Sequence, residues 1–356
     1  MAILAVGGEA ECFEIPPPGD KTGVNMGSQG LTPNPVTDPV DAAFSRTSCT
    51  FTVPCFLNFV DPQGARTVWF HFSWNSGSGG PVFFGPAPGA FTFMRDDKPM
   101  ARLYKNRTLN RYFIQTTPDN GVSWVDRGTG FVVEYFNQFR DWKRYNYDIK
   151  ITFGTLFEVY RNGAKIDSFY GGWPTQIQNC NRIGINIQDG YFSELIVADE
   201  TSIGMRLLTA NASFGITTDE WDNSATFPPN GNYGTFNDYG CDFSSYASCS
   251  TPNQSQSLAF IYSPPPSLNI NVFDGGWEVL GIAMAAIVQN IPGSNLSNAK
   301  FFLTNNTDQY YESPLIGAVP DNVGRRAQYI WSRKPLSNTP WTYQDAQNLQ
   351  VGIISQ

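Results

Sequence analysis

Hydrophobic and polar residues alternate along much of this sequence, and a period of two is typical of a β-strand with one buried face. The pattern is clearest in Thr67–Trp74, where every second residue from Val68 is apolar or aromatic, while His71 and Ser73 lie on the opposite face. We predict further strands at Val82–Phe84, Ala90–Met94, Arg111–Thr116, Phe131–Phe136, Tyr147–Phe153, Leu156–Tyr160 and Ala164–Tyr170. Asn162-Gly163, between the last two strands, is a two-residue hairpin signal.

A second hairpin is predicted within Asn181–Thr209. Isoleucines occupy every second position from 183 to 187, and Asp189-Gly190 supplies residues suited to a turn with positive φ. The return strand is predicted at Tyr191–Ala198, whose end is apolar on both faces. This hairpin is expected to close one β-domain and lead into another.

The strands predict an all-β chain, with about ten to twelve strands of the first domain stacked as two antiparallel sheets. We expect an N-terminal strand and extended arm at residues 1–40, a sandwich at 41–200 and a second, smaller β-rich domain at 201–356. The arm contains Pro16-Pro17-Pro18 and few apolar residues. It either wraps its own domain or reaches a neighbouring molecule, and the sequence does not choose between the two.

The second domain is expected to begin with a polar loop region, Asp219–Asn253. Strands are predicted at Leu258–Tyr262, Ser267–Phe273, Trp277–Gln289, Lys300–Thr304 and Ala327–Arg333. Near the end, Thr342 and Asp345 have the spacing of a capping box with an acidic third position, which predicts the start of a short helix. The helix is expected to continue to Leu349 and to end at Gly352.

Composition supports the all-β prediction. The 356 residues leave room for two domains, and the 33 glycines and 25 prolines indicate many turns. Charged residues make up 15% of the chain, against about 25% in a typical domain. The net charge of −8 argues against nucleic acid as a partner, because phosphate binding needs clustered Lys and Arg.

The first residues, MAILAVGGEAECFEI, lack a basic start, and their apolar run stops at Gly7, which is short for a signal peptide. We therefore expect synthesis in a cytoplasm without export by a standard signal. The longest apolar run, Val279–Val288, is shorter than the roughly 20 residues that span a bilayer and fits a buried strand.

Six cysteines leave two readings open: Cys12, Cys49, Cys55, Cys180, Cys241 and Cys249. They include no CxxC pair, and with one histidine in the chain no zinc ligand set is formed. The thiols are either buried and reduced, or some pair as disulfides after the protein leaves a reducing cytosol. If the chain between Cys49 and Cys55 is extended, these two lie roughly 20 Å apart and cannot pair.

Thr117–Trp124, with the sequence TPDNGVSW, matches the Asp-box pattern of sialidases. The pattern describes a hairpin turn: Asp119 accepts local backbone N–H bonds, Gly121 takes positive φ, and Trp124 packs beneath the turn. Sialidases carry several copies and a cluster of arginines for the substrate carboxylate. This chain has one copy and no such cluster, so we interpret the motif as structural.

No catalytic residues are predicted. Glycoside hydrolysis needs two carboxylates roughly 5–10 Å apart, and neither Glu194 nor the adjacent Asp199-Glu200 has a partner at that spacing. Asp96-Asp97 is interpreted as a turn. His71, the one histidine, lies in the middle of a strand beside an aromatic residue and is expected to be packed or half-exposed. No metal or other cofactor is predicted either, because no calcium-loop pattern occurs.

Three segments of the first 200 residues resemble the concanavalin A-like, laminin G-type jelly roll: VWFHFSW (68–74), YDIKITF…FEVYRNGAKI (147–166) and GYFSELIVADE (190–200). The start of the chain, the junction SELIVADETSIGMRLLT and the end RKPLSNTPWTYQDAQNLQVGI (333–353) together resemble a group of tailed-bacteriophage virion proteins. The order Ser337-Asn338-Thr339-Pro340 departs from that group's usual Pro-Thr spacing.

The resemblance implies a non-enzymatic structural part of a virion, such as a head decoration, a head or neck fibre, or a tail appendage. Its partners would be other virion proteins, and such proteins are often homotrimers. A lectin-like protein that binds glycan for host attachment is the alternative, and a glycan hydrolase is the third hypothesis. No membrane insertion is expected, and no residue is singled out as a ligand contact.

Overall fold

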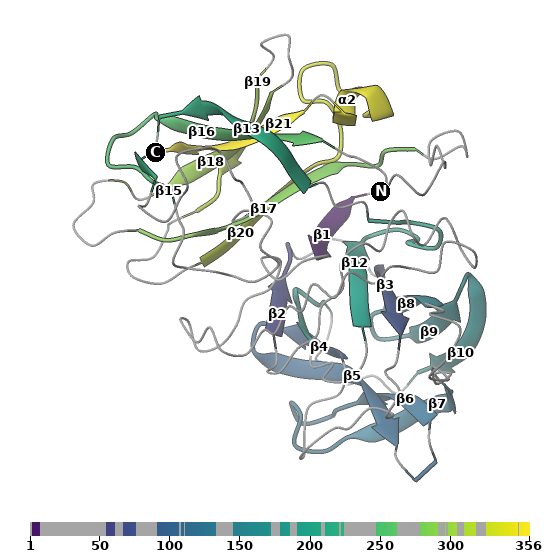
Figure 1. Cartoon of the computed structure of the whole chain (residues 1–356). Helices are drawn as coiled ribbons and strands as arrows, with labels where there is room; N and C mark the ends of the chain where they lie inside the picture. The colour runs from purple at the N-terminus through teal and green to yellow at the C-terminus, as the bar shows by residue number, and fades with distance from the viewer. Residues whose placement is uncertain are drawn as a thin grey trace. The chain divides into compact units, whose positions relative to one another are not determined.

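The chain folds as an all-β protein, and the prediction of antiparallel sheets with a short C-terminal helix is confirmed (Figure 1). The computed structural model describes residues 2–7, 55–60, 67–75, 91–106, 108–109, 111–132, 145–171, 179–185, 191–207, 211–220, 222–223, 247–261, 278–290, 296, 298–304, 310–317, 325–347 and 349–356. The strands predicted at Val82–Phe84 and Ser267–Phe273, and the arm after residue 7, lie outside these ranges. Contacts divide the chain into two compact units, Met1–Leu208 and Thr209–Gln356.

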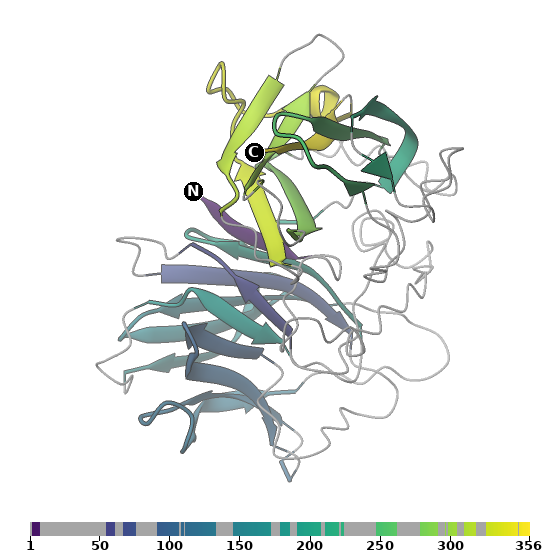
Figure 2. The ribbon, with the colours of Figure 1, turned by 90° about the vertical axis from the view of Figure 1, so that its left-hand side faces the viewer.

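The described residues of the first unit form a sandwich of two six-stranded antiparallel sheets. Sheet A contains, in spatial order, β1 (Ile3–Gly7), β12 (Tyr191–Ala198), β3 (Thr67–Asn75), β8 (Tyr145–Thr152), β9 (Leu156–Arg161) and β10 (Ala164–Tyr170). Sheet B contains β2 (Cys55–Asn58), β11 (Arg182–Ile185), β4 (Phe91–Arg95), β5 (Lys98–Asn106), β6 (Arg111–Thr116) and β7 (Val125–Phe131). The strands of this unit lie side by side across the lower part of Figure 2.

Aromatic side chains from facing strands fill the space between the two sheets. Phe72 and Phe91 have ring centroids 4.4 Å apart, and Trp74 meets Tyr112 edge to face at 5.1 Å. All four are at most 2% exposed. The alternation seen in the sequence of β3 therefore places one row of residues in the core, while the row containing His71 faces outward from sheet A.

The two sheets are also joined at their edge strands, β10 and β7, by the carboxylate of Asp167. The backbone N–H groups of Thr129 and Gly130 donate to Asp167 Oδ1 and Oδ2 at 3.1 and 3.0 Å, and Ser168 N–H donates to Oδ1 at 3.0 Å. Gly130 has φ +71°, and a Cβ there would lie 2.7 Å from the ring of Phe113. This close approach requires glycine at position 130.

The prediction of a hairpin within Asn181–Thr209 is wrong. β11 pairs with β2 and β4 in sheet B, whereas β12 pairs with β1 and β3 in sheet A. The two strands have the correct positions, but the chain changes sheets between them. Turn residues such as Asp189-Gly190 permit a hairpin without requiring one, because the pairing partner of a strand depends on distant segments.

The sequence also missed β5, whose residues KPMARLYKN do not show a clear apolar alternation. β7 covers Val125–Phe131, so it ends where a strand at Phe131–Phe136 was predicted to begin; residues 133–136 lie outside the described ranges. Asn162-Gly163 does form the predicted β9–β10 turn, with φ of +48° and +78°.

The described residues of the second unit form a five-stranded antiparallel sheet, sheet C, and two two-stranded sheets. Sheet C contains β13 (Asn211–Asp219), β16 (Ser255–Ile261), β21 (Gln350–Ser355), β18 (Ala299–Thr304) and β19 (Tyr310–Leu315). The small sheets pair β14 (Asp222–Asn223) with β15 (Ala247–Ser248), and β17 (Ile282–Val288) with β20 (Arg325–Trp331). The core of this unit includes Phe301, Leu303, Trp331 and Trp341.

The predicted capping box near the end of the chain is confirmed. Asp345 Oδ2 accepts from the Thr342 N–H at 2.8 Å, and Thr342 Oγ1 accepts from the Asp345 N–H at 3.2 Å. The helix itself, α2 (Tyr343–Gln347), is shorter than predicted. Gly352 does not end it, because Gly352 lies in β21, between β16 and β18 in the middle of sheet C. Sheet pairing on both sides outweighs the weak helical preference of these residues.

Two of the cysteines are described with their side chains. Cys180 is buried, and its Sγ lies 3.4 Å from Arg182 O. Cys249 Sγ lies 2.9 Å from both Thr251 O and Gln254 Oε1. Cys12, Cys49, Cys241 and the side chain of Cys55 lie outside the described residues, so the choice between thiols and disulfides stays a prediction. In the described part of the chain, no helix is long and apolar enough to cross a bilayer.

Candidate functional site

The outer face of sheet B carries a row of polar side chains across three adjacent strands. Register places Arg102 of β5 opposite Gln115 of β6, and Gln115 opposite Asp126 of β7. The neighbours of Arg102 on β5, Ala101 and Leu103, are buried in the sandwich core, so Arg102 points outward. We call Arg102, Gln115 and Asp126 the polar row.

Hydrogen bonds lock the polar row in one arrangement. Arg102 Nε donates to Gln115 Oε1 at 2.6 Å, and Gln115 Nε2 donates to Asp126 Oδ1 at 2.6 Å. Gln115 is buried at 7% exposure, whereas Asp126 is exposed. The row therefore holds an amide between a cation and a carboxylate, and its acidic end is open to solvent.

Two aromatic rings flank the guanidinium of Arg102. Its Cζ lies 4.0 Å from the ring centroid of Trp124 and 4.9 Å from that of Tyr104. Burial lowers the pKa of Arg102, while Tyr104 and Asp126 act in the opposite direction. The rings and the hydrogen bond to Gln115 together restrict the guanidinium, which is favourable for binding because less side-chain entropy remains to be lost.

The Asp-box turn sets the position of Trp124. Asp119 Oδ1 accepts from the Ser123 N–H at 2.7 Å, and Thr117 Oγ1 accepts from the Gly121 N–H at 2.7 Å. Gly121 has φ +98°, as predicted for the turn. The indole Nε1–H of Trp124 donates to Gly121 O at 3.0 Å. The motif interpreted as structural thus also presents an aromatic ring beside Arg102, a role that the sequence did not indicate.

The same turn perturbs the titration of Asp119. Hydrogen bonds from the side chain and backbone of Ser123 hold the pKa of Asp119 below its ordinary value of 3.8. The carboxylate is therefore charged at neutral pH and keeps the turn closed.

A second cation–aromatic stack lies toward the other edge of sheet B, on β11 and β2. The guanidinium of Arg182 lies 4.1 Å from the ring centroid of Phe56, and its Nη1 lies 2.5 Å from Asp97 Oδ1. Asp97 is in the β4–β5 turn predicted from Asp96-Asp97, and its side chain is 89% exposed. In the described part of the chain, the guanidinium of Arg182 bonds a carboxylate directly, without an intervening amide such as Gln115, so this stack is the simpler of the two.

The outer face of sheet A is polar as well, and several of its polar side chains are buried. Glu158 of β9 accepts from Lys150 at 2.9 Å and from Lys165 at 3.2 Å, and its side chain is 7% exposed. Burial acts to raise the pKa of Glu158, but the hydrogen bonds from the two lysines outweigh it and lower the pKa. Burial and the nearby Glu158 raise the pKa of Tyr160 to about 12.

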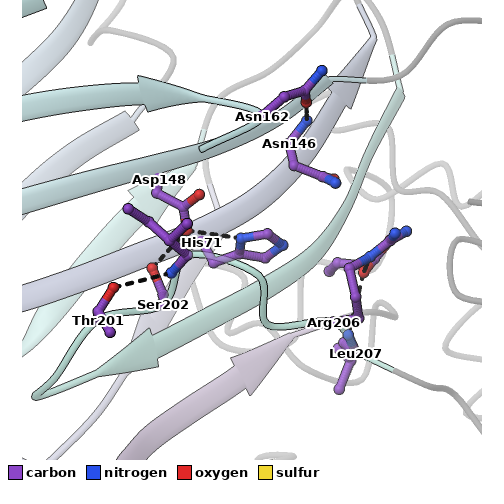
Figure 3. A network of polar contacts seen from close by, with 10 residues as sticks. His71, Asn146, Asp148, Asn162, Thr201, Ser202, Arg206 and Leu207 are labelled. Atoms are coloured by element: carbon purple, nitrogen blue, oxygen red, sulfur yellow. Dashed lines mark hydrogen bonds and ion pairs between the residues drawn. The ribbon is translucent and has the colours of Figure 1, made fainter. Parts of the chain in front are cut away.

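His71 is packed, which confirms one of the two placements expected for it (Figure 3). It is 1% exposed, and its Nδ1 lies 2.9 Å from Asp148 Oδ1. Ser202 Oγ donates to the same Asp148 oxygen at 2.7 Å. A serine nucleophile would have to bond the other ring nitrogen, so this Ser–Asp–His arrangement is a buried structural network.

Glu194 has a partner that sequence spacing did not reveal. Arg206 donates to both of its oxygens, from Nε at 2.8 Å and Nη2 at 2.9 Å, and the Leu207 N–H donates at 3.2 Å. Glu194 has φ +57° at an irregularity in the β12–β3 pairing. Asp199 accepts from the Ala2 N–H at 2.6 Å. None of these contacts brings two carboxylates together, and the described residues include no group of His, Cys, Asp or Glu that could hold a metal ion.

No family model matches the sequence, and no curated protein matches it. Among solved structures, the calreticulin globular domain of T. cruzi is similar with a TM-score of 0.38 and 12% identity, over 56% of this chain and 89% of that chain. A galectin of Caenorhabditis elegans has a TM-score of 0.24 and 14% identity, over 40% and 95%. A botulinum neurotoxin type C, whose cell entry is described as dependent on two ganglioside molecules, has a TM-score of 0.30 and 10% identity, over 41% and 36%. Each TM-score lies below 0.5, so none of these likenesses says what this chain does.

Proposed function

We propose that this protein is a lectin-like carbohydrate-binding protein and that the polar row of Arg102, Gln115 and Asp126, with Trp124 beside it, is its binding site. The observation that carries the proposal is the pair of 2.6 Å hydrogen bonds that fix a guanidinium, an amide and a carboxylate along one sheet face. The sequence alone singled out no ligand contact. It favoured a structural role in a virion and left carbohydrate binding as the alternative.

The chemistry of the row suits a sugar ring. Neighbouring sugar hydroxyls both donate and accept hydrogen bonds, so they are matched by a face that offers a charged donor and a charged acceptor on either side of an amide. The exposed oxygen of Asp126 accepts, and the guanidinium of Arg102 donates. The apolar C–H face of a sugar packs on an aromatic ring, which Tyr104 or Trp124 supplies.

We propose binding without catalysis. Hydrolysis of a glycosidic bond needs a carboxylic acid and a second carboxylate roughly 5–10 Å apart. On the polar row the described carboxylate is Asp126, and its neighbours are an amide and a guanidinium. Incubation with a bound polysaccharide should therefore leave its chain length unchanged, as measured by size-exclusion chromatography.

A glycan array, followed by calorimetry on the best ligand, tests the binding site. The wild-type chain should bind, and both Arg102→Ala and Asp126→Ala should weaken binding at least tenfold. Arg182→Ala is the matched control, because Arg182 stacks on an aromatic ring of the same sheet away from the polar row. Equal weakening by all three substitutions, or wild-type affinity in the first two, would contradict the assignment.

A structural role in a bacteriophage virion is the second candidate, and it rests on the resemblance of the two ends of the chain to virion proteins. The C-terminal segment that carries this resemblance packs in the second unit, where Trp341 is buried and donates to Trp331 O at 2.8 Å. In this proposal the chain is a head, neck or tail component, assembled as a trimer, that could present the polar row to a host or environmental glycan.

The virion proposal has two direct tests. Mass spectrometry of purified virions of the phage that encodes the chain should detect it, and labelling with antibody should place it on head, neck or tail. Mass photometry of the purified chain should show trimers. Virions without this polypeptide would exclude the structural role and leave the carbohydrate proposal intact.

A further inference from the structure

Three buried polar atoms on the outer face of sheet A are not explained by the proposed function. They are His71 Nε2, Ser73 Oγ and Asn146 Oδ1, and none has a hydrogen-bond partner in the part of the chain that the structure describes. His71 and Ser73 are each 1% exposed. Buried polar atoms are rarely left unpaired, because they lose their bonds to solvent without replacement. Three together indicate a ligand.

The three side chains are neighbours across two strands. Ser73 of β3 lies opposite Asn146 of β8 in the antiparallel register, and His71 lies two residues along β3 on the same face. Opposite residues have Cβ atoms about 4.5–5.5 Å apart, and residues two apart on a strand lie about 7 Å apart. Figure 3 shows His71 and Asn146 on these neighbouring strands.

The surrounding hydrogen bonds orient the imidazole of His71 and hold the backbone of Asn146. Asp148 Oδ1 accepts from His71 Nδ1, and Ser202 Oγ donates to the same oxygen, so the proton of the imidazole belongs on Nδ1. In the neutral ring, Nε2 then presents a lone pair. Asn162 holds the backbone of Asn146 through two bonds, Asn146 N–H to Asn162 Oδ1 at 2.9 Å and Asn162 N–H to Asn146 O at 2.8 Å.

We propose that His71, Ser73 and Asn146 form a binding site for an ordered, buried water molecule. Nε2 and Oδ1 are both acceptors and cannot bond each other, whereas a water can donate one proton to each. The Ser73 hydroxyl donates to the water oxygen, which completes three bonds, the usual number for a buried water. Two bonds of about 2.8 Å let one water join atoms roughly 5–6 Å apart. His71 and Asn146 are diagonal neighbours, with Cβ atoms about 7–8 Å apart, and side chains at that spacing on one sheet face can bring their polar ends within reach of one water.

A divalent cation fits the same atoms less well. The arrangement has one feature of a metal site, since the histidine is backed by a carboxylate. However, the three atoms that face the site are neutral, and Asp148, behind the ring, contributes a single negative charge. A buried divalent ion would keep an uncompensated charge in a site closed to solvent, which is costly. A neutral water molecule carries no net charge that the site would have to compensate.

The chain offers a direct test because it contains one histidine. Protein labelled with ¹⁵N-histidine gives one pair of imidazole nitrogen resonances, whose chemical shifts and long-range couplings to the ring protons report the tautomer. We expect a proton on Nδ1 and a hydrogen-bonded, unprotonated Nε2. A rotating-frame cross-peak should connect the His71 ring protons to a water with a residence time longer than that of surface water.

Two small substitutions distinguish contacts on the Nε2 side of the His71 ring from contacts on its Nδ1 side. Ser73→Ala removes the donor to the water, so the cross-peak should weaken and the Nε2 resonance should move toward that of a ring without a hydrogen bond. Ser202→Ala is the matched control: it removes a bond to Asp148 on the Nδ1 side and should leave the cross-peak in place.

Three results would overturn the proposal. The first is a proton on Nε2, or a coupling across a direct hydrogen bond from the Asn146 amide to Nε2. The second is the absence of a long-lived water cross-peak in the wild-type chain, a measurement that needs no variant to fold. The third is one equivalent of a divalent metal in the purified protein by elemental mass spectrometry. Sugar binding at the polar row is independent of all three.

Discussion

The outer faces of sheet A and sheet B carry the same kinds of side chain in different environments. Each carries outward-pointing polar residues beside aromatic rings on neighbouring strands. On sheet A the polar residues around β3 are buried, with His71 and Asp148 at 1% and Glu194 at 2% exposure. On sheet B, Asp126 is exposed, and Arg102 and Trp124 are partly exposed. This part of sheet A therefore belongs to the interior of the first unit, whereas the polar row on sheet B is available to a ligand.

The segment Thr201–Leu207 accounts for part of this difference. It follows β12 and is held on sheet A by the contact of Ser202 with Asp148 (Figure 3) and by that of Arg206 with Glu194. Each contact joins residues more than ten positions apart in the sequence, so neither could be predicted from the alternation of polar and apolar residues along a strand. An outward-facing polar position can thus serve stability or binding, and what covers it determines which.

Removal of the Arg206 side chain should have the largest effect. Arg206→Ala leaves the carboxylate of Glu194 buried and without its two guanidinium bonds, and loss of one partner from a buried ion pair costs about 3–5 kcal/mol. Urea unfolding should show this decrease in the free energy of unfolding. Arg182→Ala, whose partner Asp97 is exposed, should cost about 0–1 kcal/mol. A similar loss in both variants would remove the distinction between the two faces.

Arg102→Ala should separate binding from stability on sheet B. Loss of the guanidinium removes a donor to the sugar and frees Gln115, so affinity for a glycan ligand should fall about 10- to 100-fold, or roughly 1.4–2.7 kcal/mol. Because Arg102 is half-buried, the urea midpoint should change far less than in Arg206→Ala. Calorimetry for the affinity and urea unfolding for the stability, on the same protein preparations, allow the two effects to be compared. A fall in stability with unchanged affinity would assign Arg102 a structural role.

Asp119→Ala tests whether the Asp-box turn supports the site through Trp124. The substitution removes the bonds to the Ser123 N–H and hydroxyl, which should let the indole move away from Arg102. We expect a few-fold loss of affinity, since the polar row itself is unchanged, together with a shift in tryptophan fluorescence. The control is Glu220→Ala, an exposed carboxylate of the second unit that also binds a backbone N–H.

The smallest predicted effect is a pH dependence from Glu158 on sheet A. Its folded-state pKa lies below the ordinary value of 4.5, because the bonds from Lys150 and Lys165 outweigh burial. Its contribution to stability is therefore present above pH 4.5 and is lost as the pH falls through the lowered pKa. Glu158→Gln should remove about 0.5–1 kcal/mol at pH 7 and flatten this part of the stability profile, measured by urea unfolding from pH 7 to pH 3. An unchanged profile would show that the lysine contacts contribute nothing.

Sequence reasoning was most successful where structure is local. The strand at Thr67–Trp74, the Asn162-Gly163 turn, the Asp-box and the Thr342–Asp345 cap depend on neighbouring residues, and each was found. The pairing of β11 and β12 was predicted wrongly, because Asp189-Gly190 fits a hairpin turn whether or not the flanking strands pair. β5 was missed altogether, and Arg102 was missed with it.

By itself, the sequence determined the all-β class, most strand positions and the turns, because alternation, glycine and short-range hydrogen bonds act over a few residues. The tertiary structure alone decided which strands pair, which polar residues are buried, and which side chains meet. Arg102, Gln115 and Asp126 come from three strands, and His71, Asp148 and Ser202 from three distant segments. Contacts of this kind depend on long-range pairing, whose register is set by the whole core.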